Sequence, residues 1–242
     1  MLSPSRMYHH LMPAPHYTPE ALKFLRGLKR NNDREWFNAR KPTYERELKA
    51  PSLALSAAVN ESLLRFAPHN IQPPPKTLFR IYRDTRFAAD KRPYKTHQGL
   101  WWAREGLEKT SGGGFYFHIA ADEVVIAAGV FMPIREQLLA IRRHIVEHPA
   151  EFRRLLAAKK LRSLMDEVPG QKLTRAPKGF HPEDPALDLI LNREWGFLSK
   201  LPATTATQPT LLKEIVKRFE AAAPFVDFLN APLAKKPRKP LF

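Results

Sequence analysis

The sequence predicts an α+β protein in which an antiparallel or mixed central sheet is flanked by helices from both ends of the chain. Apolar residues recur every three or four positions in the first 70 residues and again after residue 133, which indicates amphipathic helices. Between residues 78 and 130 they alternate with polar residues or run continuously, as in strands. Because 43% of the 242 residues are hydrophobic, the chain can form one large packed core.

The helical segments before the sheet are marked by capping residues. Thr18 followed by Pro19 is typical of a helix N-terminus and predicts a helix over 18–30. Asn32 with Glu35 three residues later has capping-box spacing and predicts a second helix, which a proline should interrupt. A third, leucine-rich run at helical spacing should end near residue 67.

Four segments are predicted to be strands and to form the central sheet: 78–82, 98–103, 114–119 and 124–130. Because successive side chains of a strand point to opposite faces, at most one of Trp101 and Trp102 can be exposed, and the other should be in the core. In the same way, Tyr116 and His118 should share one face, opposite the phenylalanines between which they lie.

Helices are predicted again after the sheet. Pro133 and Pro149 should each open a helix, and the stretch up to about residue 185 is rich in turn residues. A last long helix carries Leu212 and Phe219 on its apolar face, and Pro224 should bend or break it. We therefore expect a single domain over 17–230, preceded by a flexible arm (1–16) and followed by a basic tail (231–242).

Charge and cysteine content restrict the partners. The 40 lysines and arginines exceed the 24 acidic residues by 16, which favours encounter with anionic molecules. The chain has no cysteine, so thiolate metal ligands and thiol nucleophiles are excluded. We find no signal-peptide core and no apolar run long enough to span a membrane. The expectation is a cytoplasmic protein with no membrane partner and no cofactor; the oligomeric state is left open.

The segment 79–99 concentrates cations, aromatic residues and two aspartates, and two interpretations of it stay open. In one, the arginines form an internal ion-pair network, in which Asp84, Asp90 or Asp184 could supply the carboxylate and Asp84 is expected to pair with Arg80 or Arg83. In the other, the segment lines a basic cleft for a phosphate or carboxylate. The candidate ligand-binding residues are Arg80, Arg83, Arg86, Tyr94, Lys95, His97 and Tyr116.

Catalytic and metal chemistry have fewer candidates. His118 and Asp84 are the residues proposed for proton transfer. No metal site is expected, because the sequence has no HExxH motif, no calcium-binding DxDxDG loop and no H-x-H spacing in the core. The tail has four cations that could contact nucleic acid: Lys235, Lys236, Arg238 and Lys239.

Several motifs together resemble one family. The motifs are NNDREWF at 31–37, FRIYRDTRFAADKRPYKTHQG at 79–99, GGGFYFHI at 112–119, AAGVFMP at 127–133 and APKGFHPEDPALDLILNREW at 176–195. Through them the sequence is similar to the domain of unknown function numbered 2461 over about residues 18 to 230. The resemblance implies a single α+β domain and no established activity.

From the sequence, the leading hypothesis is a protein that binds an anionic ligand, either a phosphorylated small molecule or nucleic acid, through a basic cleft. One alternative is an enzyme that acts on a phosphorylated small molecule by acid–base chemistry. The other is a structural module that binds a partner. Electrostatic attraction is common to all three, so the sequence does not choose between them, and whether the protein is an enzyme is left open.

Overall fold

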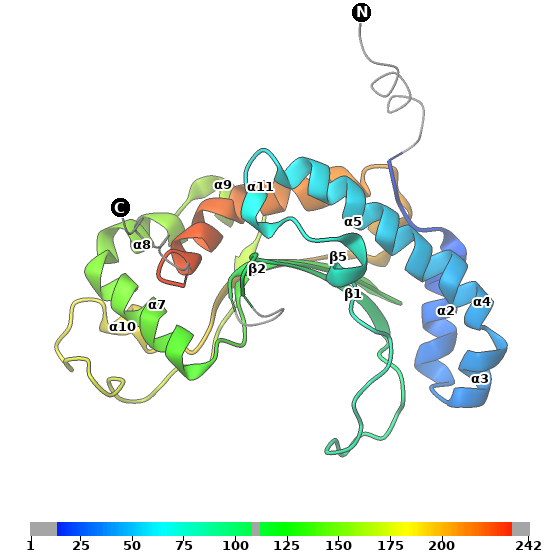
Figure 1. The fold of residues 1–242 in the computed structure, drawn as a ribbon, viewed down its shortest axis with the longest axis horizontal. Helices are drawn as coiled ribbons and strands as arrows, with labels where there is room; N and C mark the ends of the chain where they lie inside the picture. The colour runs from blue at the N-terminus through cyan, green and yellow to red at the C-terminus, as the bar shows by residue number, and fades with distance from the viewer. Residues whose placement is uncertain (1–13, 108–111, 234–242) are drawn as a thin grey trace, which may run out of the picture.

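The computed structural model describes residues 14–107 and 112–233 and shows a single sheet with helices packed around it (Figure 1). Most of the predicted arm, and all four tail cations from Lys235 to Lys239, lie outside the described residues. No helix in the described part is both long and apolar enough to span a bilayer.

Helices α2 and α3 begin at side-chain caps. In α2 (Pro19–Arg30) the Thr18 hydroxyl accepts a hydrogen bond from the backbone of Ala21, as predicted. Helix α3 (Arg34–Ala39) is capped by Asp33, whose carboxylate accepts from the Trp36 N–H at 2.8 Å. The cap is therefore one residue later than predicted, because a carboxylate near the positive end of the helix dipole is a strong N-cap.

The chain then continues through several short turns into the first long helix over the sheet. Pro42 lies in the first turn of α4, so the predicted interruption is confirmed. The elements in order are α4 (Lys41–Tyr44), a π-helical turn η1 (Glu45–Lys49), α5 (Ala50–Leu63), η2 (Pro68–Asn70) and α6 (Pro74–Thr77).

The central sheet is antiparallel and has five strands in the order β1-β2-β3-β5-β4. Three strands match the prediction closely, and the helices come from both ends of the chain, so the predicted fold class is confirmed. The strands are β1 (His97–Ala103), β2 (Gly114–Ala120), β3 (Glu123–Val130), β4 (Asp166–Glu167) and β5 (Trp195–Pro202).

The predicted strand at 78–82 is wrong. Only Leu78, which bridges to Leu100, contacts the sheet by a ladder pair, and Tyr82 bridges to Tyr94. The segment is instead one side of a ribbon that leaves the sheet edge at β1 and returns to it (Figure 1). We call residues 79–96 the arginine loop.

Strand β5 was not predicted, and it lies inside the sheet between β3 and β4. Strand β3 pairs with β5 over its whole length, from Glu123 opposite Pro202 to Val130 opposite Trp195. Gly129 is required there, because its φ is 139° and a Cβ would collide with the carbonyl oxygen of Trp195.

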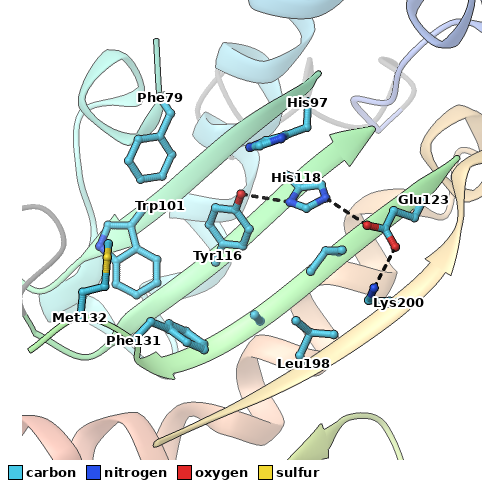
Figure 2. A pocket seen from close by; sticks show the side chains of 12 residues that line it. Phe79, His97, Trp101, Tyr116, His118, Glu123, Phe131, Met132, Leu198 and Lys200 are labelled. Atoms are coloured by element: carbon cyan, nitrogen blue, oxygen red, sulfur yellow. Dashed lines mark hydrogen bonds and ion pairs between the residues drawn. The ribbon is translucent and has the colours of Figure 1, made fainter. Parts of the chain in front are cut away.

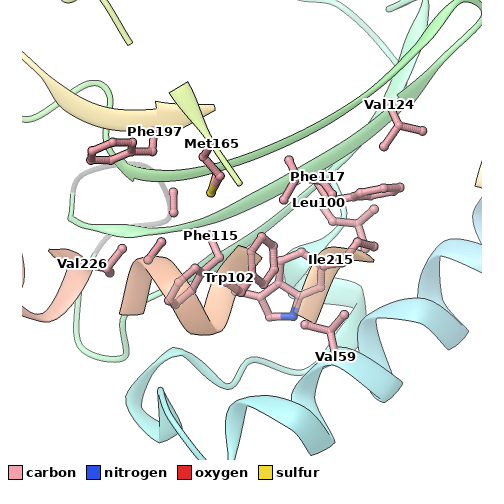
Figure 3. Close-up of a cluster of buried hydrophobic side chains, with 14 of the residues drawn as sticks. Val59, Leu100, Trp102, Phe115, Phe117, Val124, Met165, Phe197, Ile215 and Val226 are labelled. Carbon is pink, nitrogen blue, oxygen red and sulfur yellow. The ribbon is translucent and has the colours of Figure 1, made fainter. Parts of the chain in front are cut away.

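The core lies between the sheet and the helices α5 and α11 (Leu211–Asn230), which cover one face (Figures 1 and 3). Trp102 and Phe115 contact the ring of Phe219 in α11, with centroid distances of 5.4 and 4.9 Å. Pro224 lies within α11 and does not end it, so the predicted break is absent from this helix. We call this the covered face of the sheet.

The remaining helices pack at the edge of the sheet near β4 and β5 (Figure 1). Both predicted proline-initiated helices are present, although the first starts two residues after Pro133. These helices are α7 (Arg135–Glu147), α8 (Pro149–Leu156), α9 (Lys159–Arg162) and α10 (Leu187–Ile190). The 3-10 turn η3 (Ala203–Thr207) follows β5 and lies elsewhere, where the Ala206 carbonyl accepts the Tyr17 N–H.

Candidate functional site

The face of the sheet opposite α5 and α11, which we call the pocket face, holds a cavity of about 410 Å³ (Figure 2). This volume lies in the range of small-molecule sites. Side chains alternate along each strand, so the strand register places them side by side on this face. One row across the sheet is Trp101, Tyr116, Ala127 and Leu198, and the next is Gly99, His118, Val125 and Lys200.

One end of the pocket is aromatic. The ring of Trp101 lies 6.5 Å from that of Tyr116 and 6.3 Å from that of Phe131. Phe79, at the start of the arginine loop, lies 6.3 Å from the Tyr116 ring, and the exposed Met132 completes this wall. The arrangement offers a surface against which a flat apolar group can pack.

The other end is polar, and its groups form a chain across three strands (Figure 2). The hydroxyl oxygen of Tyr116 lies 3.0 Å from Nδ1 of His118. On the far side of that ring, Nε2 lies 3.9 Å from Oε1 of Glu123, whose Oε2 is 3.3 Å from Nζ of Lys200. With the proton on Nε2, facing the carboxylate, Tyr116 donates its hydrogen bond to Nδ1.

Burial shifts these groups toward their neutral forms. It lowers the pKa of His118 to about 3, aided by His97 and Lys200, and raises the pKa of Tyr116 to about 12. The pKa of His97 is lowered as well, first by burial and then by Lys95, against an opposing effect of Glu123. At neutral pH the pocket therefore holds two neutral imidazoles and a neutral phenol, which can each donate and accept hydrogen bonds.

Gly99 makes room for this arrangement. The Tyr116 side chain lies across it, so a Cβ at this position would be 3.0 Å from the Tyr116 hydroxyl and 3.2 Å from the Phe79 ring. Both distances are shorter than ordinary van der Waals contact. The glycine in the predicted strand 98–103 thus marks a close side-chain approach within the pocket.

Two aspartates of the arginine loop form ion pairs with three of its arginines. Arg83 pairs with Asp90 at 2.5 Å, and Arg92 reaches the same carboxylate at 2.7 Å. Asp84 accepts from Arg86 at 2.8 Å, so the predicted pairing of Asp84 with Arg80 or Arg83 is wrong, whereas Asp90, another predicted partner, does meet Arg83. The reason is local backbone geometry, because Asp84 and Asp90 each also accept the backbone N–H two residues later, which turns them toward Arg86 and Arg92.

The structure brings together only some of the predicted site residues. His97, Tyr116 and His118 line the pocket, and Lys95 adjoins it, with Nζ 5.1 Å from the Phe79 ring centroid. The lining does not include the four loop residues Arg80, Asp84, Arg83 and Arg86.

Tyr94 has a structural role instead. It is buried and its ring stacks on Phe37 at 4.1 Å. Asn32 holds its backbone on both sides, donating to the Tyr94 carbonyl and accepting from the Tyr94 N–H, each at 3.0 Å. These contacts tie the returning strand of the arginine loop to α3.

Sequence reasoning missed several pocket residues because their positions depend on the tertiary fold. Lys200 and Leu198 belong to β5, which was not predicted. Glu123 is the first residue of β3 and follows a tight turn. Its spacing of two residues from Val125, which places both on one face of the strand, was the one sign in the sequence that it faces the pocket. The wall formed by Phe131 and Met132 follows a continuous apolar strand that gave no sign of which residues face a cavity.

The fold and pocket define an α+β protein with a small-molecule-sized cavity on the pocket face of an antiparallel sheet. Residues 20–228 match the family described as "Conserved hypothetical protein (DUF2461)", so the chain belongs to the DUF2461 family. Neither curated proteins nor solved structures gave a match.

Proposed function

We propose that the protein binds a small organic ligand with a flat apolar body and an anionic end in the pocket of the sheet. The observation that carries the proposal is the division of one cavity into an aromatic wall and a buried polar chain. Trp101 and Phe131 supply the wall, and Tyr116 and His118 supply hydrogen bonds at the other end. Apolar lining with a few convergent polar groups is the usual composition of a ligand site.

The charge of the ligand follows from the cations near the polar end. Lys200 lies within the pocket lining and Lys95 stands beside it, and both disfavour protonation of a neighbouring histidine. Glu123 balances Lys200 in part, at 3.3 Å. A carboxylate or phosphate placed near His97 would be attracted by Lys95 and would accept hydrogen bonds from an imidazole.

Nucleic acid is less well supported as the ligand of the folded domain. The arginines that would contact a phosphate backbone are largely paired: Arg83 and Arg92 with Asp90, and Arg86 with Asp84. Contact through the tail cations stays a prediction from the sequence alone.

The proposal is tested by binding of three matched probes, 2-naphthoate, 2-naphthyl phosphate and the neutral 2-naphthylmethanol, measured by calorimetry. We expect 2-naphthoate or 2-naphthyl phosphate to bind more tightly than the alcohol. We expect Tyr116→Phe and His118→Gln each to weaken the binding of that anionic probe. Arg86→Ala is the matched control, because Arg86 is an exposed cation outside the pocket. Binding that is lost in Arg86→Ala but kept in the pocket variants would place the site in the arginine loop.

An enzyme is the second candidate, and the Tyr116–His118 contact favours it. An imidazole 3.0 Å from a phenol has the geometry of a proton-transfer pair, but burial separates their pKa values to about 3 and about 12, so a bound substrate would have to bring these values together before a proton could move. Asp84, the other predicted catalytic residue, lies in the arginine loop and pairs with Arg86. Release of 2-naphthol from 2-naphthyl phosphate, abolished by Tyr116→Phe, would favour the enzyme; recovery of unchanged probe from a saturated protein would favour binding alone.

A further inference from the structure

The C-terminal end of α7 carries three metal-ligand residue types on one side. His144, Glu147 and His148 are spaced i, i+3 and i+4, which places their side chains on one face of a helix. Their ligand atoms all lie within 4.8 Å of one another. The order H-x-x-E-H is the reverse of HExxH and keeps two histidines four residues apart on one helix face, which is the spacing that binds zinc in that motif.

The His144 ring packs against another helix, and the backbone of His148 is fixed at a corner of the chain. The half-buried ring of His144 lies 4.5 Å from the ring of Phe228 in α11 and 4.6 Å from that of His148. His148 ends α7, donating its backbone N–H to the His144 carbonyl, and Pro149 begins α8 directly after it. A fixed corner of the chain reduces the conformational entropy lost when a ligand binds these rings.

Local electrostatics favours a cation at this position. The carbonyl end of the 13-residue α7 carries partial negative charge, and Glu147 adds a full charge. Glu151, in the first turn of α8, is a second carboxylate that acts on the His144 ring.

We propose that His144, His148 and Glu147 bind a zinc ion, leaving a fourth position for water or another ligand. Two imidazoles and one carboxylate are a recurrent zinc donor set, whereas calcium and magnesium prefer oxygen ligands throughout. Bonds of about 2.1 Å need donor atoms roughly 3.4 Å apart in a tetrahedron. The donor atoms now lie within 4.8 Å of one another, and Glu147 and His148, whose side chains are exposed, would have to rotate to bring them closer.

The site is separate from the proposed ligand pocket, because none of its three residues lines that cavity. The zinc proposal and the ligand proposal therefore stand or fall independently. Replacement of the pocket imidazole in His118→Gln should leave zinc affinity unchanged.

The test is a zinc titration of the full chain in competition with a chromophoric chelator. His9 and His10, which lie outside the described residues, are first replaced by alanine so that this adjacent pair does not contribute. We expect one zinc ion per chain, an affinity at least tenfold weaker in His148→Ala, and a smaller loss in Glu147→Gln. Cobalt(II) in place of zinc should give the visible absorption of a tetrahedral site, and His148→Ala should remove it.

Two controls make the result decisive. His69→Ala removes an exposed imidazole that is already bonded to Glu105 at 2.7 Å, and it should bind zinc like the parent. Melting temperatures in the presence of a chelator should agree between the parent and His148→Ala, since His148 is exposed. His144→Ala is less informative, because it also removes packing on Phe228. No zinc binding by the parent, or equal binding by His148→Ala, would overturn the proposal.

Discussion

The two faces of the sheet are built from alternate residues of the same strands, yet they differ in chemistry. Trp102 is fully buried on the covered face against Phe219, and its neighbour Trp101 lines the cavity on the pocket face. In β2 the phenylalanines point to the helices, while Tyr116 and His118 point to the cavity. Because successive side chains of a strand point to opposite faces, one residue packs in the core and the next lines the pocket.

The pocket face, unlike the covered face, is partly solvated. The His118 side chain is 15% exposed, which is enough burial to disfavour its charge. Polar groups kept in such a position must satisfy one another, as Tyr116 and His118 do. The covered face is filled by apolar packing. The pocket face is only partly covered and carries polar groups, which suits it to bind a ligand.

The largest expected difference concerns the two tryptophans. We expect Trp102→Ala to lower the free energy of unfolding by about 3–5 kcal/mol, the range for large-to-small changes in a packed core. Trp101→Ala should cost clearly less, because it enlarges a cavity that already exists. Urea unfolding of both variants measures this. Equal losses would mean that the two faces contribute alike to stability and that our division of the sheet is wrong.

The alternation that underlies this difference could be predicted from the sequence, and so could the placement of Tyr116 opposite the phenylalanines. The prediction that at most one tryptophan is exposed agrees with the structure, in which both are buried. The limit of the pattern was its inability to show which face would be covered, since that depends on where α5 and α11 pack.

The strand order was beyond sequence reasoning for a different reason. The segment 78–82 alternates like a strand, but only its start contacts β1, where Leu78 bridges to Leu100. Its other end pairs within the arginine loop, where the Lys95 N–H donates to the Ile81 carbonyl and Tyr82 bridges to Tyr94. The segment 195–202 contains a glycine and ends in proline, which are weak strand residues, yet β3 provides it with a full antiparallel partner. In both segments the pairing partners in the folded chain, and not the residue pattern, determined whether a strand of the sheet formed.

The arginine loop shows the same limit for charge. Its six cations suggested a binding cleft, but Asp84 and Asp90 are close enough in sequence to pair with three of the arginines locally. The residues that do converge, Tyr116, Glu123 and Lys200, come from three strands. A dense motif is visible in a sequence, whereas a pocket assembled across a sheet is not.

The second prediction uses the buried histidine of the pocket face. The pKa of His118 is about 3 in the folded protein and about 6.5 for an unperturbed histidine, so below pH 6.5 the unfolded chain binds a proton that the folded one does not. Stability is therefore lost as the pH falls from 6.5 toward 3. Between pH 7 and 4.5 this one residue should remove about 2–3 kcal/mol.

Urea unfolding at the two pH values, in the parent and in His118→Gln, isolates that contribution. Glutamine keeps a hydrogen-bonding group but does not titrate, so the variant should lose less stability in acid by that amount. The same acid sensitivity in both proteins would show that His118 is not held neutral, and the contrast between the two faces would lose its electrostatic part.

The third prediction couples ligand binding to His97. An anion bound beside this ring would raise its pKa from the lowered value of the free protein, so binding should take up a proton. The affinity for 2-naphthoate should then rise by up to about tenfold per pH unit on acidification from neutral pH, until the free ring also titrates. Calorimetry in buffers of different ionisation enthalpy detects the proton, and His97→Gln should abolish the slope. A pH-independent affinity in the parent would exclude an anion next to His97.

The smallest expected effect on stability is that of Gly99→Ala, and it concerns the pocket face alone. The added Cβ would be 3.0 Å from the Tyr116 hydroxyl and 3.2 Å from the Phe79 ring, so the two side chains must move by a few tenths of an ångström. The strain is offset by the lower entropy of an alanine in the unfolded chain, and we expect a net change within about 1 kcal/mol. Binding of 2-naphthoate should fall more, because Tyr116 moves relative to His118. Repeating the substitution in a Tyr116→Phe background removes the closest contact, and a double-mutant cycle should then show a smaller cost of the added methyl group. An identical cost in both backgrounds would mean that Gly99 is needed for the strand itself and not for the position of Tyr116.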